Sequence, residues 1–461
     1  MDQGIQINKG VYDRVNEQMK QKYILHFGMN SLSTEIVPLT LTQFVSKYAS
    51  NLDFWESNQP QLNLIKKMKP PDVILAVHAI CDNAIQGLQK RIDEMGVSEE
   101  VEILIRRRQE NKSRFHRQDM FQYFKNVKMV TKKHPEFDEF DMQSAIDFHK
   151  NRSTKVVSQK LDGIKCFVKD EGRHEDAETF EIWGVEYAIH WLIKKGRLEH
   201  GGAVASMTDG NHGEALAYVA SKHNMQAHVY APSNIGNACR QRIVDFGASI
   251  CDVDGSYDEC IQKLIDDASN NKWTIVSATS WNGYEEIPRL IMTGYTALFH
   301  DMMSQVESAP THMFVQAGVG SLLGACVVYM KKHFPDTQIV CVEPMDAACL
   351  LENVLACETT QTFKQCKGKM QSNMQGPNCG TPSFVSWPLI TDHVDLFVGI
   401  RDRWAEKAVD KMEDWGIKTC ETGAAGIAGL MALISTPDSK KCCNVSENSS
   451  VFFICTEADI K

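Results

Sequence analysis

The sequence predicts an α/β protein over residues 135–461, preceded by a mostly helical region over residues 1–134. After about residue 135, short apolar strands alternate with helical segments and glycine-containing turns, which is typical of a mostly parallel sheet with helices on both faces. Before that point, apolar residues recur at three- and four-residue spacing, for example over residues 73–95. The difference in texture indicates two separate modules.

The composition indicates an ordinary globular chain. Its 461 residues are 43% hydrophobic and 23% charged, which suits two or three folding units. No apolar run reaches membrane-spanning length and the start carries no signal sequence, so we expect a cytoplasmic protein without membrane contact. The 15 cysteines show no metal-binding or disulfide spacing, and we expect reduced thiols and no metal. The net charge of −10 argues against nucleic-acid binding.

Six strands are expected in the larger module. Ligands of such folds bind beyond the carboxyl ends of parallel strands, where the motifs considered next are found. The expected strands are residues 166–169, 203–206, 227–230, 313–316, 339–342 and 450–455.

The first motif, residues 316–321 (QAGVGS), joins an expected strand to an apolar helix. Glycines let the backbone curl so that several N–H groups face one anion, and the helix N-terminus adds partial positive charge. Ser321 could donate a further hydrogen bond. The motif predicts a phosphate site, although tight packing between strand and helix would also explain the glycines.

Two further motifs have both a functional and a packing interpretation. Residues 208–213 (TDGNHG) also join a strand to a helix; there Asn211 could bind the edge of a planar ligand and Asp209 could act as a general base. Alternatively, Asp209 or Asn211 only caps the helix. Residues 420–429 (CETGAAGIAG) repeat small residues every third position, which permits close backbone approach and is common in packing alone.

Taken together, these motifs resemble the pyridoxal-phosphate (PLP) enzymes of fold type II, the tryptophan synthase β-like group, and most closely diaminopropionate ammonia-lyase. The resemblance covers residues 135–461. It extends to residues 280–281 (SW), 283–285 (GYE), 287–288 (IP), 294–295 (GY), 342–344 (VEP), 379–382 (CGTP) and 456–459 (TEAD).

The resemblance implies a fold and a set of roles. The fold would consist of two parallel-sheet subdomains, the smaller at roughly 206–294 inserted in the larger, in a homodimer. Asn211 would face the ring hydroxyl, Asp209 would be the acid/base partner of the cofactor lysine, and Thr456 would lie near the ring nitrogen. The cofactor phosphate would be cradled by Gly318, Val319, Gly320 and Ser321.

The pattern breaks at the lysine that should hold the cofactor. Residues 169–188 (KDEGRHEDAETFEIWGVEYA) align with the family's lysine segment without a gap, and the lysine falls on Glu181. A carboxylate cannot form the imine with the PLP aldehyde, and its charge disfavours a nearby anion. Glu181 could act as a base or be simply solvated. Lys165 and Lys169, on or beside the preceding strand, are not expected to reach the aldehyde.

Three functions follow from this break, and the sequence leaves open whether the chain is an enzyme. The favoured one is a catalytically inactive pseudoenzyme of the lyase type with a ligand-binding, regulatory or scaffold role. The second is an active lyase that holds PLP non-covalently and acts on a small amino acid with Asp209 or Glu181 as base. The third is an interaction protein that binds a partner through residues 1–134, where the basic run 106–108 suits an acidic partner.

Overall fold

The structure is a computed structural model. It describes residues 114–116, 121–125, 135–173, 177–208, 210–233, 235–254, 257–356 and 363–459. Apart from residues 353–356, these belong to one compact unit made of residues 112–352 and 363–461. The predicted helices before residue 114, the basic run 106–108 and Asp209 lie outside the described residues.

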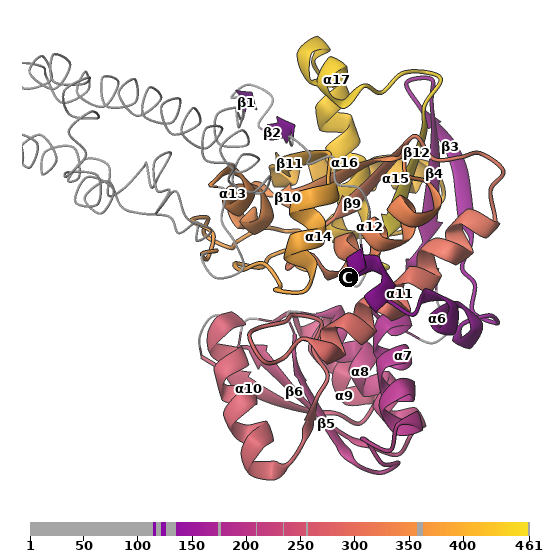
Figure 1. Cartoon of the computed structure of the whole chain (residues 1–461). Coiled ribbons are helices and arrows are strands. Elements are labelled where there is room, and N and C mark those ends of the chain that lie inside the picture. The colour runs from indigo at the N-terminus through magenta and orange to yellow at the C-terminus, as the bar shows by residue number, and fades with distance from the viewer. Residues whose placement is uncertain are drawn as a thin grey trace, which may run out of the picture. The chain divides into compact units, whose positions relative to one another are not determined.

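Two sheets form the centre of this unit and lie in separate lobes (Figure 1). The larger sheet has the strand order β1-β2-β11-β10-β9-β12-β4-β3 and the smaller the order β7-β6-β5-β8. The larger contains β1 (Arg114–His116), β2 (Phe121–Lys125), β3 (Val156–Leu161), β4 (Ile164–Asp170), β9 (His312–Gln316), β10 (Gln338–Pro344), β11 (Leu396–Ile400) and β12 (Ser450–Cys455). The smaller contains β5 (Ala203–Met207), β6 (Gln226–Pro232), β7 (Ser249–Val253) and β8 (Thr274–Ile275).

The predicted α/β architecture is confirmed. All six expected strands fall within β4, β5, β6, β9, β10 and β12. Every pair in the smaller sheet is parallel, as are the inner pairs of the larger sheet from β11 to β4. The antiparallel pairs are those of β1, β2 and β3 at the two edges. The smaller sheet is drawn from residues 203–275, and the expected subdomain limits of 206–294 stay a prediction.

Two strands lie in the region expected to be mostly helical. β2 pairs antiparallel with β11, and Phe124, which is fully buried, lies opposite Phe397 with ring centroids 6.3 Å apart. The segment 121–125 (FQYFK) is rich in aromatic residues, which favour strands. The larger sheet therefore extends into residues before 134, and position 134 is not its boundary.

A helix follows each inner strand of the two sheets except β12, which is the last element. Among the described residues, no helix is both long and apolar enough to cross a membrane. The helices are α6 (Met142–Phe148), α7 (Glu181–Lys194), α8 (Asn211–Lys222), α9 (Asn237–Asp245), α10 (Tyr257–Asn271), α11 (Glu286–Ser304), α12 (Ser321–His333), α13 (Cys349–Leu355), α14 (Ser386–His393), α15 (Asp402–Asp414), α16 (Glu421–Ile434) and α17 (Pro437–Cys443). Short 3₁₀ turns are η1 (Pro135–Glu139), η2 (Glu171–Arg173) and η3 (Met345–Ala347).

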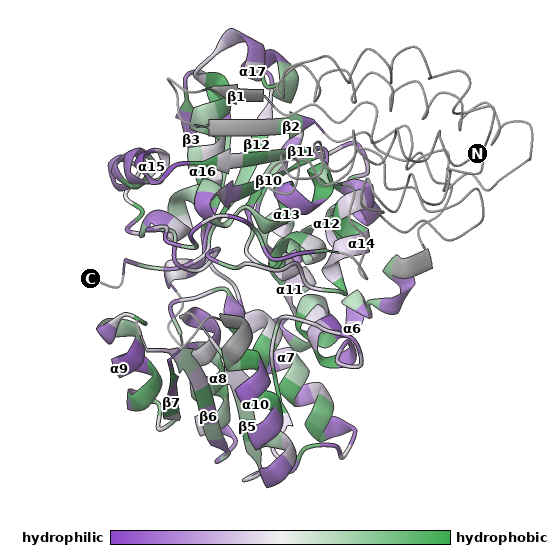
Figure 2. Ribbon diagram, turned by 90° about the vertical axis from the view of Figure 1, so that its left-hand side faces the viewer, coloured by the Kyte–Doolittle hydropathy of each residue, from purple (hydrophilic) through white to green (hydrophobic). Residues whose placement is uncertain are grey.

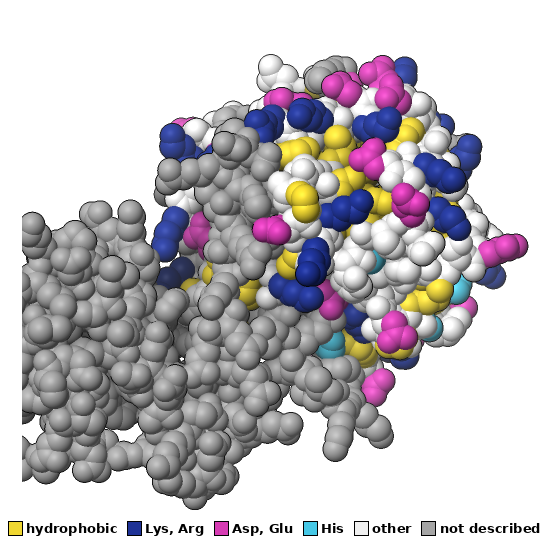
Figure 3. Space-filling model, turned by 90° about the horizontal axis from the view of Figure 1, so that it is seen from above, with side chains coloured by type: hydrophobic (Ala, Val, Ile, Leu, Met, Phe, Trp, Pro, Cys, Tyr) yellow, Lys and Arg dark blue, Asp and Glu magenta, His cyan; other side chains and the backbone are white. Residues whose placement is uncertain are grey.

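The helices turn apolar sides to the sheets and polar sides outward. Figure 2 shows hydrophobic residues along β10 and β12 and hydrophilic ones on the outer sides of α10 and α15. In α15 the buried residues, Trp404, Ala405, Ala408 and Met412, recur at helical spacing. On the face shown in Figure 3, basic and acidic side chains are interspersed.

Helix α16 contains the small-residue motif, and its packing interpretation is confirmed. A Cβ atom added to Gly426 would lie 3.2 Å from the Phe314 carbonyl oxygen, and one added to Gly429 would lie 2.5 Å from Val342 Cγ2. These glycines therefore let α16 lie directly on β9 and β10. This contact fixes the end of β9, where the candidate site begins.

Candidate functional site

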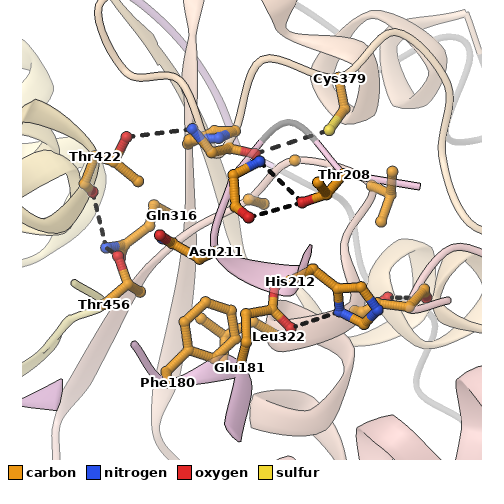
Figure 4. Close-up of a pocket in the computed structure, with 18 of the residues that line it drawn as sticks. Phe180, Glu181, Thr208, Asn211, His212, Gln316, Leu322, Cys379, Thr422 and Thr456 are labelled. Atoms are coloured by element: carbon orange, nitrogen blue, oxygen red, sulfur yellow. Dashed lines mark hydrogen bonds and ion pairs between the residues drawn. The ribbon is translucent and has the colours of Figure 1, made fainter. Parts of the chain in front are cut away.

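A pocket of about 120 Å³ lies where the carboxyl-terminal ends of β5, β9 and β12 meet (Figure 4). Residues from both lobes line it, including members of the motifs 208–213 and 316–321. The lining residues are Phe180, Glu181, Met207, Thr208, Gly210, Asn211, His212, Ser277, Ala278, Tyr295, Gln316, Ala317, Gly318, Val319, Gly320, Ser321, Leu322, Gly376, Pro377, Cys379, Thr422 and Thr456. This is the position at which open α/β folds bind ligands.

Residues 318–321, which we call the glycine loop, form one wall. Gly320 has φ +101° and precedes α12, whose 13 residues direct their N-terminus at the pocket. Within the described part of the chain, the amides of Gly318, Val319 and Gly320 have no hydrogen-bond acceptor. Free amides at a helix N-terminus form a site for an anion.

Packing also requires the two glycines of this loop. A Cβ atom at Gly318 would lie 2.9 Å from Cys379 Sγ, and one at Gly320 would lie 2.5 Å from Ile390 Cδ1. The packing interpretation of the glycines is therefore confirmed, and the phosphate site stays a prediction, since no described residue accepts from the loop amides. Only the free amides indicate a ligand.

Ser321 differs from its expected role. Its hydroxyl donates to the Ala278 carbonyl oxygen at 2.7 Å. The bond to a phosphate predicted for this hydroxyl is thus not preformed, although Ser321 does line the pocket. The hydroxyl instead connects α12 to the segment that follows β8.

Thr208 closes the start of α8, a role that the sequence suggested for Asp209 or Asn211. The Thr208 hydroxyl oxygen accepts hydrogen bonds from the Gly210 amide at 2.9 Å and the Gly213 amide at 3.0 Å. Asn211 is the first residue of α8, after Gly210 at the cap position. The capping interpretation is therefore wrong for Asn211, and Asp209 is not among the described residues.

The side chain of Asn211 instead connects the two lobes. Its amide donates to the carboxylate of Glu457, which also accepts from Cys420 Sγ at 3.3 Å. Burial raises the pKa of Glu457, and the hydrogen bonds from Asn211 and Cys420 oppose that rise. The sequence drew attention to the segment 456–459 but not to Glu457 itself, because nothing in the pattern said which residue it would meet.

Gln316 and Thr456 form the rear of the pocket. The Gln316 amide donates to the carbonyl oxygens of Thr422 and Ile454, both at 3.0 Å, and to Thr456 Oγ1 at 3.2 Å. The two protons of this amide are shared among the three acceptors, and the contact with the Thr456 hydroxyl is the longest. The predicted place of Thr456 at the rim of a ring is compatible with this geometry.

Two helices position the opposite wall. A Cβ atom at Gly184 would lie 2.5 Å from Tyr295 Cε1, and one at Gly294 would lie 2.4 Å from the Trp183 carbonyl oxygen. These glycines let α7 and α11 approach closely, which brings the Tyr295 hydroxyl to Glu181, the first residue of α7.

Glu181 is held by two donors. Its Oε2 accepts from the Tyr295 hydroxyl and from His212 Nδ1, the latter at 3.1 Å. His212 Nε2 lies 2.8 Å from the Val276 carbonyl oxygen, which can only accept, so both ring nitrogens donate and the ring is an imidazolium. The side chains of Glu181 and His212 are 15% and 10% exposed, and the expectation of a simply solvated Glu181 is wrong.

The pKa shifts agree with a buried ion pair. Burial lowers the pKa of His212, but the hydrogen bond and charge of Glu181, helped by the Val276 carbonyl, outweigh it and leave the pKa above the ordinary 6.5. Burial and the Glu181 charge raise the pKa of Tyr295 well above 10, so its hydroxyl keeps its proton. No described residue donates to the second carboxylate oxygen, Oε1.

Residues 152–457 match the family described as pyridoxal-phosphate dependent enzymes. The chain belongs to this family. It is 32% identical over 269 residues to the diaminopropionate ammonia-lyase of Salmonella typhimurium, covering 55% of this chain and 66% of that enzyme. It is 26% identical over 362 residues to the Escherichia coli enzyme, covering 70% of this chain and 90% of that enzyme.

Solved structures agree with this assignment. The crystal structure of the E. coli diaminopropionate ammonia-lyase with an aminoacrylate–PLP azomethine intermediate has a TM-score of 0.67 at 25% identity, over 74% of this chain and 94% of that one. Maize serine racemase shares the fold, with a TM-score of 0.60 at 18% identity over 70% and 94% of the two chains. The predicted resemblance to fold-type II PLP enzymes and to the ammonia-lyase is confirmed.

The pocket of this PLP-family chain fits the cofactor at one wall and not at the other. The free amides of the glycine loop suit a phosphate. No lysine of the described residues lines the pocket, and the wall opposite the glycine loop carries Glu181, paired with His212. Nor do the described residues contain a group of His, Cys, Asp and Glu side chains suited to a metal ion.

Two neighbouring lysines do not replace the missing one. Lys169 is fully buried and donates to the Thr154 carbonyl oxygen at 2.6 Å and to Asp301, outside the pocket lining. Lys165 is exposed on β4. Residues 174–176 lie outside the described part, and Glu178, which follows them, lies 3.4 Å from Arg242.

Proposed function

We propose that this chain is a diaminopropionate ammonia-lyase-like pseudoenzyme with a ligand-binding role. One observation carries the proposal: Glu181, which the resemblance places at the family's lysine position, is held by hydrogen bonds from His212 and Tyr295. A carboxylate forms no covalent bond with an aldehyde, and the described part of the pocket offers no other amine.

The surroundings of Glu181 also limit its use as a base. Glu181 Oε2 already accepts hydrogen bonds from the Tyr295 hydroxyl and His212 Nδ1, so this oxygen is not open to a substrate proton. Removal of a substrate proton, which the family's lysine normally performs, is therefore disfavoured at this position. The geometry supports loss of both functions of the lysine through one substitution.

The remaining wall supports a role in binding. The amides of Gly318, Val319 and Gly320 would hold the phosphate of PLP or of a related ester, with Asn211 and Thr456 beside the ring. Bound PLP supplies an electrophilic aldehyde and an electron-withdrawing ring. In this chain the aldehyde would meet a carboxylate, so the bond to the protein would be non-covalent.

Borohydride reduction after incubation with PLP tests the proposal. The unmodified protein should show no reducible absorption band, whereas Glu181→Lys should show one and retain PLP after reduction. Glu199→Lys, the same change at an exposed position outside the pocket lining, should behave like the unmodified protein. A reducible band in the unmodified protein would show that another amine reaches the aldehyde, and the pseudoenzyme proposal would be wrong.

An active lyase of altered mechanism is the second candidate. It is favoured by Glu181, a residue of the pocket lining whose Oε1 has no partner among the described residues. The test is ammonia release from small amino acids with PLP present, comparing the unmodified protein with Glu181→Gln. Release that is abolished by this substitution would support the second candidate over the first.

The other expectations stay predictions. A homodimer is tested by molar mass in solution, and a cytoplasmic location by fractionation of cells. A partner of residues 1–134 is tested by capture with and without that region.

A further inference from the structure

We infer that the pocket binds pyridoxamine 5′-phosphate, the amine form of the cofactor, in preference to the aldehyde form. The inference rests on the proposed function and specifies its ligand. It follows from opposite chemistry at the two walls. Among the residues that the structure describes, none accepts from the amides of the glycine loop, and none donates to Glu181 Oε1 at the start of α7.

The glycine loop binds what the two forms share. Three free amides and the N-terminus of α12 favour a phosphate dianion, and both forms carry the same phosphate ester. Gly318 packs on Cys379, which Figure 4 shows across the pocket from Glu181 and His212. A ligand anchored by its phosphate would therefore extend toward Glu181.

The wall at Glu181 distinguishes the two forms. An aldehyde oxygen only accepts hydrogen bonds, as does a carboxylate, so the two repel each other. The protons of His212 and Tyr295 are both directed to Glu181 Oε2, and neither can reach an aldehyde without giving up that bond. A primary ammonium instead donates to the open Oε1 in a charge-assisted bond.

The charge balance points the same way. His212 neutralises Glu181, and the phosphate at the loop leaves the occupied pocket anionic. Pyridoxamine 5′-phosphate carries an ammonium group beside its phosphate and so compensates part of this charge. In the usual pairing, an amine of the protein meets an aldehyde of the ligand. At Glu181, a carboxylate of the protein would instead meet an amine of the ligand.

Equilibrium titration of the full chain with four vitamers tests this inference. Pyridoxine 5′-phosphate is the matched ligand, because it has a neutral hydroxyl in place of the ammonium. Pyridoxamine 5′-phosphate should bind about tenfold more tightly than pyridoxine 5′-phosphate, as a charge-assisted hydrogen bond predicts, and more tightly than PLP. Pyridoxamine without phosphate should bind weakly.

A variant locates the preference. Glu181→Gln should bring the affinities for pyridoxamine 5′-phosphate and pyridoxine 5′-phosphate close to each other, whereas Glu199→Gln should keep the preference for the amine. Equal binding of the two esters by the unmodified protein, or binding of none, overturns the inference without needing a variant. The absence of a reducible band with PLP would still leave the pseudoenzyme proposal standing, whereas such a band would overturn both.

Discussion

The two walls of the pocket recognise a ligand in different ways. The glycine loop uses backbone amides, and its conformation is fixed by packing against Cys379 and Ile390. The start of α7 uses one side chain, Glu181, with its two donors. A wall made of backbone survives most substitutions, whereas a wall that depends on one side chain changes its chemistry with a single residue. Binding and catalysis can therefore separate within one pocket.

The largest effect should come from altering the backbone wall. Gly320→Ala places a Cβ atom 2.5 Å from Ile390 Cδ1 at φ +101°, and should lower the free energy of unfolding by about 4 kcal/mol, the sum of left-handed strain and overpacking. Chemical denaturation measures it. Gly416→Ala, with φ +75° and open space around it, isolates the strain, and Gly236→Ala, with neither, should be close to neutral.

This series can contradict the packing argument. If Gly320→Ala lowers the free energy of unfolding no more than Gly416→Ala does, the loop can move away from Ile390 without loss of stability. The loop would then not be fixed by packing, and the contrast with the α7 wall would lose its basis.

The side-chain wall should be the next most sensitive. His212→Leu leaves the Glu181 carboxylate without its cationic partner. The free energy of unfolding should fall by about 3 kcal/mol, as it does when one partner of a buried ion pair is removed. In the double variant with Glu181→Gln the total cost should be smaller than the sum of the single costs, because no charge stays unpaired. Additive costs in a double-mutant cycle would show that the pair contributes no coupling.

Most of the fold could be predicted because its signals are local. The six strands follow from apolar runs bounded by turns, and the order of strand, glycine turn and helix determines where a ligand can bind. Strand β2 was missed since its aromatic segment reads equally as part of a helical region. Its assignment depends on pairing with β11, in which Val398 lies opposite Tyr123 from a distant part of the chain, and such pairing leaves no local trace.

The sequence predicted which residues line the candidate site but not which of them contact one another. The sequence identified Glu181 at the lysine position and the loop at 318–321, and both line the pocket. It did not identify His212 and Tyr295 as the partners of Glu181. The Tyr295 contact depends on the close packing of α7 and α11 at Gly184 and Gly294, and the His212 contact depends on the approach of α8 to α7. Such partners arise from tertiary packing, which spacing alone does not reveal.

The pH dependence of stability tests whether His212 is protonated in its pair with Glu181 at the α7 wall. The folded-state pKa of His212 lies above the ordinary 6.5, so its contribution is fully present below about 6.5 and is lost as pH rises through the folded pKa. The stability of the unmodified protein relative to Glu181→Gln should therefore fall over that window in denaturation measured at a series of pH values. A constant difference would mean that His212 does not carry the proton in the pair.

The smallest effect is expected at Ser321, and it distinguishes a backbone wall from a side-chain wall. The hydroxyl donates to the Ala278 carbonyl oxygen, so Ser321→Ala should cost about 1 kcal/mol in unfolding experiments. Ser304→Ala, which removes a similar bond at an exposed helix end, should cost less. The affinity for pyridoxamine 5′-phosphate should stay within about threefold, because backbone amides hold the phosphate. A large loss of affinity would mean that the hydroxyl turns to the ligand, and that this wall, like the one at Glu181, depends on a side chain.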